Sequence, residues 1–384
     1  MKYMGSKRSM LKNGLGEILL RESAAHPRFV DLFTGSGAVA SFIATRVSVP
    51  VFAYDLQDYS RVLAGAIISR DTEADYRIIW KRWRARAKRV HAALVSDLPP
   101  EFVIDPVLHI DRARVWCELR GKGPITRAYG AHYFSPIQAA WIDSLRLTVS
   151  KDEPECMITL AALIDAASEC AASPGHTAQP FQPTKTAVKH LEAAWGRDVL
   201  TKVRTSLKRI ASERALRIGR AEVGDANKVA LELQEGDLVF VDPPYSALHY
   251  SRFYHVLESV VRGIEGDVSG VGRYPKSDAR PRSAYSVKTE AHGALDSLLR
   301  DLASRKVDVI LTFPNHNCSN GLSGEAIRAI SERYFETSEV SVKSRMSTLG
   351  GAGFDSVKDE IRGARRNAEE LIILMKSSRF VSGA

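Results

Sequence analysis

The stretch RFVDLFTGSGAVASFIATRV, residues 28–47, decides the fold class. Its first six residues fit a short buried strand, TGSG is a tight turn, and the remainder has the apolar spacing of an amphipathic helix. A second strand pattern, VPVFAYD, ends at Asp55, and DYSRVLAGAIIS then returns to helical spacing. This alternation predicts a doubly wound α/β sheet with right-handed crossovers.

The α/β alternation stops near residue 70 and returns near residue 206. The segment between reads as mostly helical, with loops such as DLPPEFVIDP. We therefore expect an α/β domain with a Rossmann-like sheet, mostly parallel with a closing antiparallel hairpin, in residues 1–70 and 206–384, and an inserted, mainly helical domain in residues 71–205. Further strands are expected at about residues 218–223, 237–241, 307–313, 336–346 and 368–376.

Composition narrows the class of protein. Hydrophobic residues make up 45% of the 384 residues and charged residues 26%, which are ordinary globular values. No apolar run reaches the length of a membrane span, and the N-terminus lacks the apolar core of a secretory signal, so we expect a soluble, cytoplasmic protein. The four cysteines show no CxxC spacing, which disfavours zinc and disulfides. A net charge of +9 favours a polyanionic partner.

The stretch DLVFVDPPYSALHY, residues 237–250, carries the most specific chemical pattern. Its aliphatic residues fit a buried parallel strand that ends at Asp242. Pro243 and Pro244 cannot continue the strand, and they leave it on a rigid backbone with unpaired carbonyl acceptors. Tyr245 adds one aromatic ring to this platform.

The first glycine loop, with Gly35 and Gly37, lets the backbone approach a ligand at the carboxyl end of a strand. It does not match a dinucleotide fingerprint, because Ala40 stands at the last position and Asp31 would repel a pyrophosphate. A ligand with an ammonium group fits better. An ordinary strand-to-helix turn is the alternative for this loop.

Four acids end predicted strands at the same edge of the sheet: Asp31, Asp55, Asp225 and Asp242. Asp55 is placed to accept from ribose hydroxyls. Asp225 can accept from the exocyclic amine of a bound adenine, and the alternative role for it is a helix N-cap. The convergence of the four acids favours a ligand site over coincidence.

KYMGSK at the N-terminus, FVDLFTGSGAVA and VDPPY, in this order, resemble the S-adenosylmethionine-dependent DNA adenine-N6 methyltransferases of the alpha motif order, the Dam-like, DPPY type. The resemblance implies a class I methyltransferase sheet, S-adenosyl-L-methionine and no metal, and an inserted target-recognition domain. It also implies a cytoplasmic, nucleoid-associated protein of a bacterium or phage, a monomer or weak dimer, with a restriction or phage-defence system as a candidate association. The implied cofactor residues are Tyr3, Lys7, Asp31, Phe33, Gly35, Gly37, Asp55, Asp225 and Ala226.

The resemblance gives the proline loop a role on double-stranded DNA. Asp242 and the Pro243 carbonyl would each accept one hydrogen of an adenine N6 amine, and Tyr245 would stack on the base rotated out of the duplex. The resemblance therefore implies Asp242, Pro243, Pro244 and Tyr245 as the catalytic residues. Methylation of cytosine N4 or of an RNA amine is an alternative, and a DNA-binding protein with an inactive methyltransferase fold is another.

Residues 77–91, RIIWKRWRARAKRVH, contain seven Lys or Arg and no acid, with Trp80 and Trp83 between them. Such a helix can lie along phosphates, or it can be a solvated helix whose tryptophans are buried. The candidate DNA contacts are Lys81, Arg82, Arg84, Arg86 and Arg89, with Arg362, Arg365 and Arg366 in the late hairpin. Tyr250, Phe253 and Tyr254 fit either a base pocket or, by preference, the core.

Overall fold

The computed structural model describes residues 7–264, 266–347, 353–355, 360–362 and 365–377, and between 343 and 368 it describes only the backbone. Contacts divide the chain into two compact units. The sheet unit comprises Gly5–Asp71, Arg214–Tyr250 and Arg282–Ala384, and the helical unit comprises Met1–Met4, Thr72–Glu213 and Ser251–Pro281. Beside the expected insertion, the helical unit thus includes a second segment from late in the chain.

The sheet unit is built on a seven-stranded sheet with the order β3-β2-β1-β4-β7-β11-β8. The first five strands in this order pair in parallel, and β11 pairs antiparallel with both β7 and β8. The strands are β1 (Phe29–Asp31), β2 (Val51–Asp55), β3 (Arg220–Val223), β4 (Leu238–Val241), β7 (Asp308–Pro314), β8 (Glu336–Ser347) and β11 (Arg365–Lys376). The expected Rossmann-like sheet with a closing antiparallel hairpin is confirmed.

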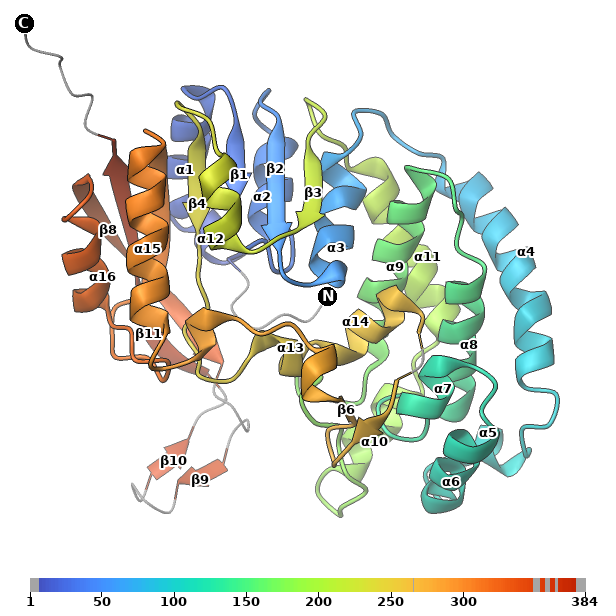
Figure 1. Cartoon of the computed structure of the whole chain (residues 1–384). Helices are drawn as coiled ribbons and strands as arrows, with labels where there is room; N and C mark the ends of the chain where they lie inside the picture. The colour runs from blue at the N-terminus through green and yellow to red at the C-terminus, as the bar shows by residue number, and fades with distance from the viewer. Residues whose placement is uncertain (1–6, 265, 348–352, 356–359, 363–364, 378–384) are drawn as a thin grey trace, which may run out of the picture. The chain divides into compact units, whose positions relative to one another are not determined.

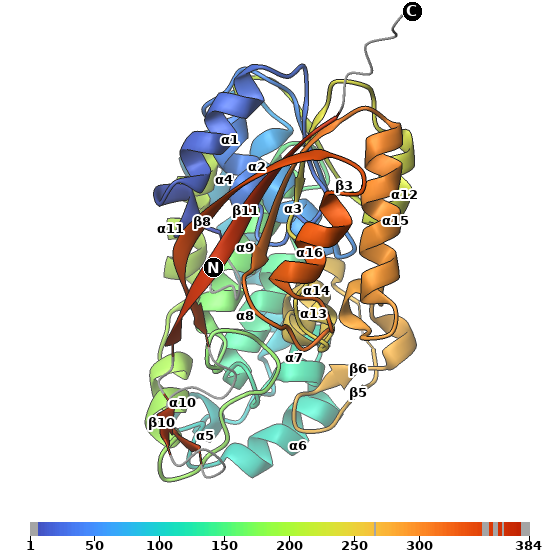
Figure 2. The same cartoon turned by 90° about the vertical axis from the view of Figure 1, so that its left-hand side faces the viewer.

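Helices cover both faces of this sheet, as Figure 2 shows. One face is covered by α1 (Leu15–Ala24), α2 (Ala38–Ala44) and α3 (Asp58–Ile68). The other is covered by α12 (Ala226–Val229), α15 (Ala291–Ser304) and α16 (Gly324–Ser331). Short 3-10 turns lie at Met10–Lys12, Ala230–Glu232 and Ala284–Ser286, and a small hairpin pairs β9 (Gly353–Asp355) with β10 (Glu360–Arg362).

The central strand β4 shows why the segment before the prolines is purely aliphatic and aromatic. Val239 and Val241 belong to the core under α15, whereas Leu238 and Phe240 belong to the core on the opposite face. All four are at most 1% exposed. Burial on both faces stabilises an uninterrupted apolar strand, and this strand carries Asp242 to the edge of the sheet.

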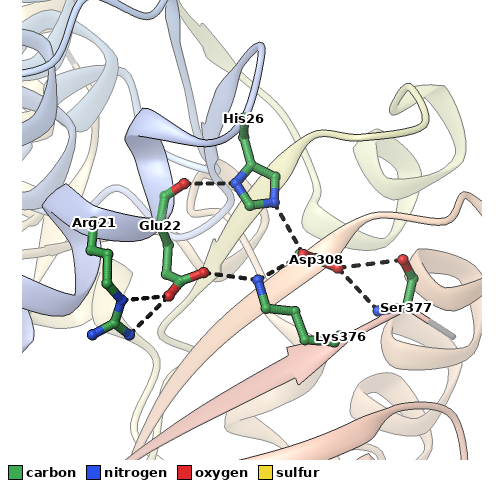
Figure 3. A network of polar contacts seen from close by, with 6 residues as sticks. All are labelled: Arg21, Glu22, His26, Asp308, Lys376 and Ser377. Atoms are coloured by element: carbon green, nitrogen blue, oxygen red, sulfur yellow. Dashed lines mark hydrogen bonds and ion pairs between the residues drawn. The ribbon is translucent and has the colours of Figure 1, made fainter. Parts of the chain in front are cut away.

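A network of polar contacts joins the end of α1 to the neighbouring strands β7 and β11 of the sheet (Figure 3). His26 Nε2 lies 3.1 Å from Asp308 Oδ2, and Lys376 donates to both Asp308 and Glu22 at 2.8 Å. Ser377 N–H donates to Asp308 Oδ1 at 3.0 Å. The network thus ties the start of β7 and the end of β11 to the first helix of the unit.

The helical unit contains α4 (Tyr76–Leu94), α5 (Glu101–Ile104), α6 (Ile110–Arg120), α7 (Pro124–Tyr129), α8 (Pro136–Leu147), α9 (Glu155–Cys170), α10 (Val188–Trp195), α11 (Val199–Ser212) and α14 (His255–Arg262). The hairpin of β5 (Val268–Ser269) and β6 (Tyr274–Pro275) belongs to it, and α13 (Tyr250–Phe253) spans the boundary. The helices α4, α8, α9 and α11 pack together (Figure 1). No helix in the described residues is long and apolar enough to span a membrane.

Candidate active site

The acids at the ends of neighbouring strands meet at one edge of the sheet. Asp31, the last residue of β1, pairs in register with Ala53 of β2 and with Phe240 of β4. Asp55 and Asp242 follow these partners by two residues. Parallel strands therefore bring the three carboxylates together at the carboxyl edge, where open α/β sheets bind ligands.

The glycine loop is bound to the end of the second strand. Gly35 has φ +52° and Gly37 has φ +70°, in the left-handed region that favours glycine. The Gly35 N–H donates to Asp55 Oδ2 at 2.8 Å. A Cβ on Gly37 would lie 3.1 Å from the backbone nitrogen of Ala64, so a side chain there would press on α3. The loop is a rigid, close turn.

Asp31 is the most deeply buried acid of this edge, with 1% of its side chain exposed. Burial raises its pKa to about 8, and the nearby carboxylates of Asp242 and Asp55 add to the shift. A buried carboxyl beside two others binds a cation more favourably than an anion. This charge distribution fits the ammonium group expected from the sequence and opposes a pyrophosphate.

The two outer acids already have backbone partners. Asp55 Oδ1 accepts from the Gln57 N–H at 3.1 Å, in addition to the bond from Gly35. Asp225 caps α12, with Oδ1 accepting from the N–H groups of Asn227 at 3.0 Å and Lys228 at 3.4 Å. The N-cap role weighed for Asp225 is therefore present. Both capping bonds use one oxygen, and a carboxylate offers a second.

Lys7 lies between two carboxylates next to the proline loop. Its Nζ is 3.0 Å from Asp242 Oδ1 and 2.7 Å from Glu370 Oε2. Thr312 Oγ1 donates to the same Asp242 oxygen at 2.9 Å. Burial opposes the charge on Lys7, but the two carboxylates outweigh it and raise the Lys7 pKa. Burial and then Glu370 raise the Asp242 pKa, while Lys7 and Thr312 act in the opposite direction.

Among the residues that the structure describes, both contacts of Asp242 use Oδ1 and neither uses Oδ2. The side chain is 16% exposed, so it is reachable from the edge of the sheet. Tyr245 stands beside it, with its ring edge-to-face against Phe313 and Tyr250 at 6.4 and 6.5 Å between centroids. Lys7 Nζ is 6.0 Å from the Tyr245 ring centre. The platform thus holds an anionic acceptor, a fixed cation and an oriented aromatic ring.

Asn320 donates a hydrogen bond to the backbone of the proline loop. It was not identified as a site residue from the sequence. It is fully buried, and its Nδ2 donates to the carbonyls of Pro244 at 2.8 Å and Tyr285 at 2.9 Å. The Tyr285 hydroxyl donates to Asn227 Oδ1 at 2.8 Å, and its ring packs edge-to-face on Phe33 at 5.1 Å. The buried amide of Asn320 therefore links the proline loop to Tyr285, and Tyr285 in turn contacts Phe33 and the start of α12, which Asp225 caps.

Glu370 and Thr312 were also missed, although each had a weak sequence signal. Thr312 is a polar residue within the otherwise apolar VILTFP, and Glu370 stands where the polar first half of β11, RRNAEE, gives way to the apolar LIILM. Such residues mark positions where a strand contacts a polar site. The signal does not name the partner, because the partners come from segments far apart in the sequence.

The helix α4 divides its candidate DNA contacts between two faces. Lys81, Arg82, Arg84 and Arg89 are exposed, while Arg86 is half-buried and donates to the Thr148 carbonyl at 3.3 Å. Arg82 forms an ion pair of 2.6 Å with Glu155. Trp83 is fully buried and donates to the Leu145 carbonyl at 3.0 Å. Trp83 is therefore a core residue, as the alternative interpretation of this helix expected.

The remaining expected residues are placed as follows. Phe253 and Tyr254 are buried in the helical unit, which confirms the preference for a core role, whereas Tyr250 packs on Tyr245. Asn315, in the loop after β7, donates to Glu369 at 3.1 Å and accepts from Arg328 at 3.3 Å. Tyr3 lies outside the described residues. Arg362 falls in β10, and Arg365 and Arg366 in β11, but their side chains lie outside the described part.

The strand order, the glycine turn after β1 and the acid-proline loop after β4 define a Rossmann-like methyltransferase. A family model for D12 class N6 adenine-specific DNA methyltransferases matches residues 3–90 and 171–310. The chain belongs to this family and is a DNA methyltransferase. Among the described residues, no group of three or more His, Cys, Asp or Glu side chains is arranged to hold a metal ion.

Proteins with similar sequences are named as type II methyltransferases or modification methylases. The type II methyltransferase M.NlaIII of Neisseria lactamica is 26% identical over 98% of this chain and 100% of its own length. The modification methylase LlaI of Lactococcus lactis subsp. lactis is 23% identical over 83% of this chain, and StsI of Streptococcus sanguinis is 23% identical over 82%. The chain spans less than half of these last two, 46% and 44% of their lengths.

Proposed function

We propose that the protein transfers a methyl group from S-adenosylmethionine to the N6 amine of adenine in duplex DNA, acting on a base rotated out of the helix. The observation that carries the proposal is the Asp242 carboxylate, which anchors Oδ1 to Lys7 and Thr312 and leads into two prolines and Tyr245. An adenine amine is a poor nucleophile, since its lone pair is delocalised into the ring. Two fixed acceptors can turn that lone pair away from the ring.

In this proposal, Asp242 Oδ2 and the Pro243 carbonyl each accept one N6 hydrogen. Lys7 and Thr312 hold the carboxylate in place, so it need not reorganise when the base arrives. Tyr245 offers a ring on which the extruded base can stack. Asn320 fixes the Pro244 carbonyl and with it the direction of the backbone that carries the Pro243 acceptor.

The buried acids at the sheet edge fit a cationic methyl donor. S-adenosylmethionine, when bound, supplies the methyl group on a positively charged sulfonium. Asp31 would face its ammonium group, Gly35 and Gly37 would let the backbone approach, and Asp55 would accept from the ribose. Asp225 and Ala226, with Phe33, would frame the adenine ring, and Tyr3 and Lys7 would help to close the site.

The helical unit is the candidate for choosing the DNA sequence. Readout of base edges requires side chains in the grooves, whereas arginines and lysines on phosphates supply position and affinity. We infer that Lys81 and Arg84 of α4 contact DNA, together with Arg362, Arg365 and Arg366 of the sheet unit. Arg82, Arg86 and Arg89 lie on a different face of α4, where Glu155 and the Thr148 carbonyl bond two of them. The rest of the helical unit carries the sequence preference.

The test is methyl transfer to DNA followed by digestion to nucleosides and identification of the modified base by mass. N6-methyladenine is expected, and N4-methylcytosine as the sole product would exclude the adenine assignment. Asp242→Ala should lower the rate on the order of a hundredfold, about 3 kcal/mol in the barrier, while S-adenosylmethionine binding measured by calorimetry stays within a few-fold. Asp71→Ala, at an exposed acid of the sheet unit beyond the end of α3, is the matched control.

A further inference from the structure

The basic residues of α4 form two separate stripes. Arg77, Lys81, Arg84 and Lys88 follow one another at spacings of four, three and four, which places them on one face of the helix. Arg82, Arg86 and Arg89 form the second stripe by the same spacing. The second stripe faces protein partners, since Arg82 pairs with Glu155 and Arg86 bonds the Thr148 carbonyl.

The first stripe borders a groove shared with α11. The groove has a volume of about 430 Å³ and is lined by Trp80, Lys81, Arg84, Ala85, Lys88 and Arg204. No acid lines it. A neighbouring groove at the start of α4 differs, because Glu73 and Asp75 line it together with Arg77 and Lys208. Of these two grooves, the one along the middle of α4, called here the α4–α11 groove, is therefore the one lined by cations without an acid.

The four cations of the α4–α11 groove are exposed, and none of them forms an ion pair with another part of the chain that the structure describes. The helix α4, which carries three of them, is anchored through its tryptophans. Trp80 packs edge-to-face on Trp83 at 6.1 Å, and Trp83 is anchored in the core through its bond to Leu145. Four like charges around one groove repel one another unless an anion lies among them.

We propose that the α4–α11 groove binds the phosphate backbone of duplex DNA; this deepens the proposed function and rests on it. From Lys81 to Lys88 the groove cations of α4 extend about 10 Å along the helix, which matches about three phosphates at about 3.4 Å of duplex axis each. The helical unit contains 27 Lys and Arg against 20 Asp and Glu, and so carries +7 of the net +9. The half-buried Trp80 offers a flat surface between the cations.

The proposal distinguishes the two stripes of one helix, so each can serve as the control for the other. The groove variant carries Lys81→Gln, Arg84→Gln and Lys88→Gln, and the outer variant carries Arg82→Gln, Arg86→Gln and Arg89→Gln. Each removes three charges and keeps residues that favour a helix. Affinity for a fluorescent duplex is measured by anisotropy at several salt concentrations, without cofactor, after thermal melting has shown that both variants are folded.

In the groove variant, log affinity should fall less steeply with log salt: the magnitude of the slope should decrease by about 2.7, which is three contacts at about 0.9 each. The outer variant should keep the slope of the unchanged protein to within about 0.5. Arg204→Gln alone should lower the slope by about 0.9, because α11 contributes one side of the groove. An unchanged slope in the groove variant, or an equal loss in both variants, overturns the proposal.

Should the outer variant fail to fold, the single change Arg89→Gln replaces it, and it is compared with Lys88→Gln at the adjacent position. A weaker salt dependence of duplex binding in Lys88→Gln alone supports binding in the α4–α11 groove. An equal weakening in both single variants overturns the proposal. These binding measurements are separate from methyl transfer. A protein that binds duplex through the groove but methylates no DNA would refute the proposed function, whereas a methylating protein with an unaltered groove variant would refute only the groove.

Discussion

The ammonium of Lys7 lies 3.0 Å from Oδ1 of Asp242, so the start of the sheet unit contributes a charge to the proline loop after β4. The same ammonium lies 2.7 Å from Glu370 of β11. Two buried carboxylates thus share one cation, and the ionisation of Asp242 depends on a residue that comes from another end of the chain.

The first prediction concerns this shared cation. Lys7→Gln removes the charge that opposes the raised Asp242 pKa, while the Glu370 carboxylate continues to raise it. Asp242 must be ionised to accept an N6 hydrogen, so the acidic limb of the rate profile should move to higher pH by about one unit or more. The measurement is the methyl-transfer rate as a function of pH under saturating substrates.

The matched control for Lys7→Gln is the double variant Lys7→Gln with Glu370→Gln. Removing the second carboxylate abolishes the repulsion, so the acidic limb should return part of the way toward its original position. Melting temperatures identify any general loss of stability, which is expected because breaking a buried pair costs about 3 kcal/mol or more. A profile that does not move in the single variant would show that Lys7 does not control the Asp242 charge.

The second prediction concerns Asp31. Its pKa of about 8 means that it is mostly protonated near pH 7 before a ligand binds. A bound ammonium group favours the carboxylate, so binding of S-adenosylmethionine between about pH 5 and 7 should release up to about one proton. Calorimetry in buffers of different ionisation enthalpy measures this release. Asp31→Asn should abolish the buffer dependence, and a buffer-independent heat in the unchanged protein would contradict the prediction.

The third prediction concerns Asn320. In Asn320→Asp, a carboxylate would replace the amide that donates to the Pro244 and Tyr285 carbonyls. Two buried carbonyls would lose their donor, at a cost of about 1 to 3 kcal/mol each. We expect kcat to fall at least about tenfold, while KM for DNA changes by less than about threefold. Asn317→Asp, at an exposed position three residues earlier, should leave both constants unchanged. Equal effects of the two changes would remove the positioning role from Asn320.

The fourth prediction concerns the network of His26, Asp308, Lys376 and Glu22 in Figure 3. The hydrogen bond to Asp308 raises the His26 pKa against the effect of burial, so its contribution to stability is full below about pH 6.5 and is lost as pH rises through the folded pKa. Burial alone would raise the pKa of Glu22 and of Asp308, but hydrogen bonds outweigh it and lower both pKa values. The main such bond comes from Lys376 for Glu22 and from His26 for Asp308. The stability that these two acids contribute is therefore lost as pH falls below about 4.5. The network should therefore stabilise the fold most between about pH 4.5 and 6.5.

The measurement for this network is the melting temperature from pH 4 to 9. His26→Gln should lower stability by about 1 to 2 kcal/mol near pH 5.5 and by less above pH 8. His292→Gln, at an exposed histidine on α15, should follow the unchanged protein throughout. A destabilisation by His26→Gln that is the same at all pH values would show that the histidine acts through packing alone.

The local sequence determined the sheet of this protein. Apolar runs of strand length, glycines where φ must be positive and prolines that end a strand act over a few residues, and they indicate β1, the turn at Gly35 and Gly37, and the exit from β4 without tertiary information. The same local patterns place Asp31, Asp55 and Asp242 at strand ends. Parallel pairing of neighbouring strands then brings these ends to one edge.

Only the tertiary structure decided which side chains meet there. Glu370, Thr312 and Asn320 are polar residues in segments distant in sequence from the proline loop. Their roles arise because β7 lies next to β4, β11 lies next to β7, and Asn320 reaches the Pro244 carbonyl. The two stripes of α4 are likewise visible in the sequence, but which of them lines the α4–α11 groove depends on the packing of α8, α9 and α11. Periodicity gives the faces of a helix, whereas their neighbours come from long-range burial.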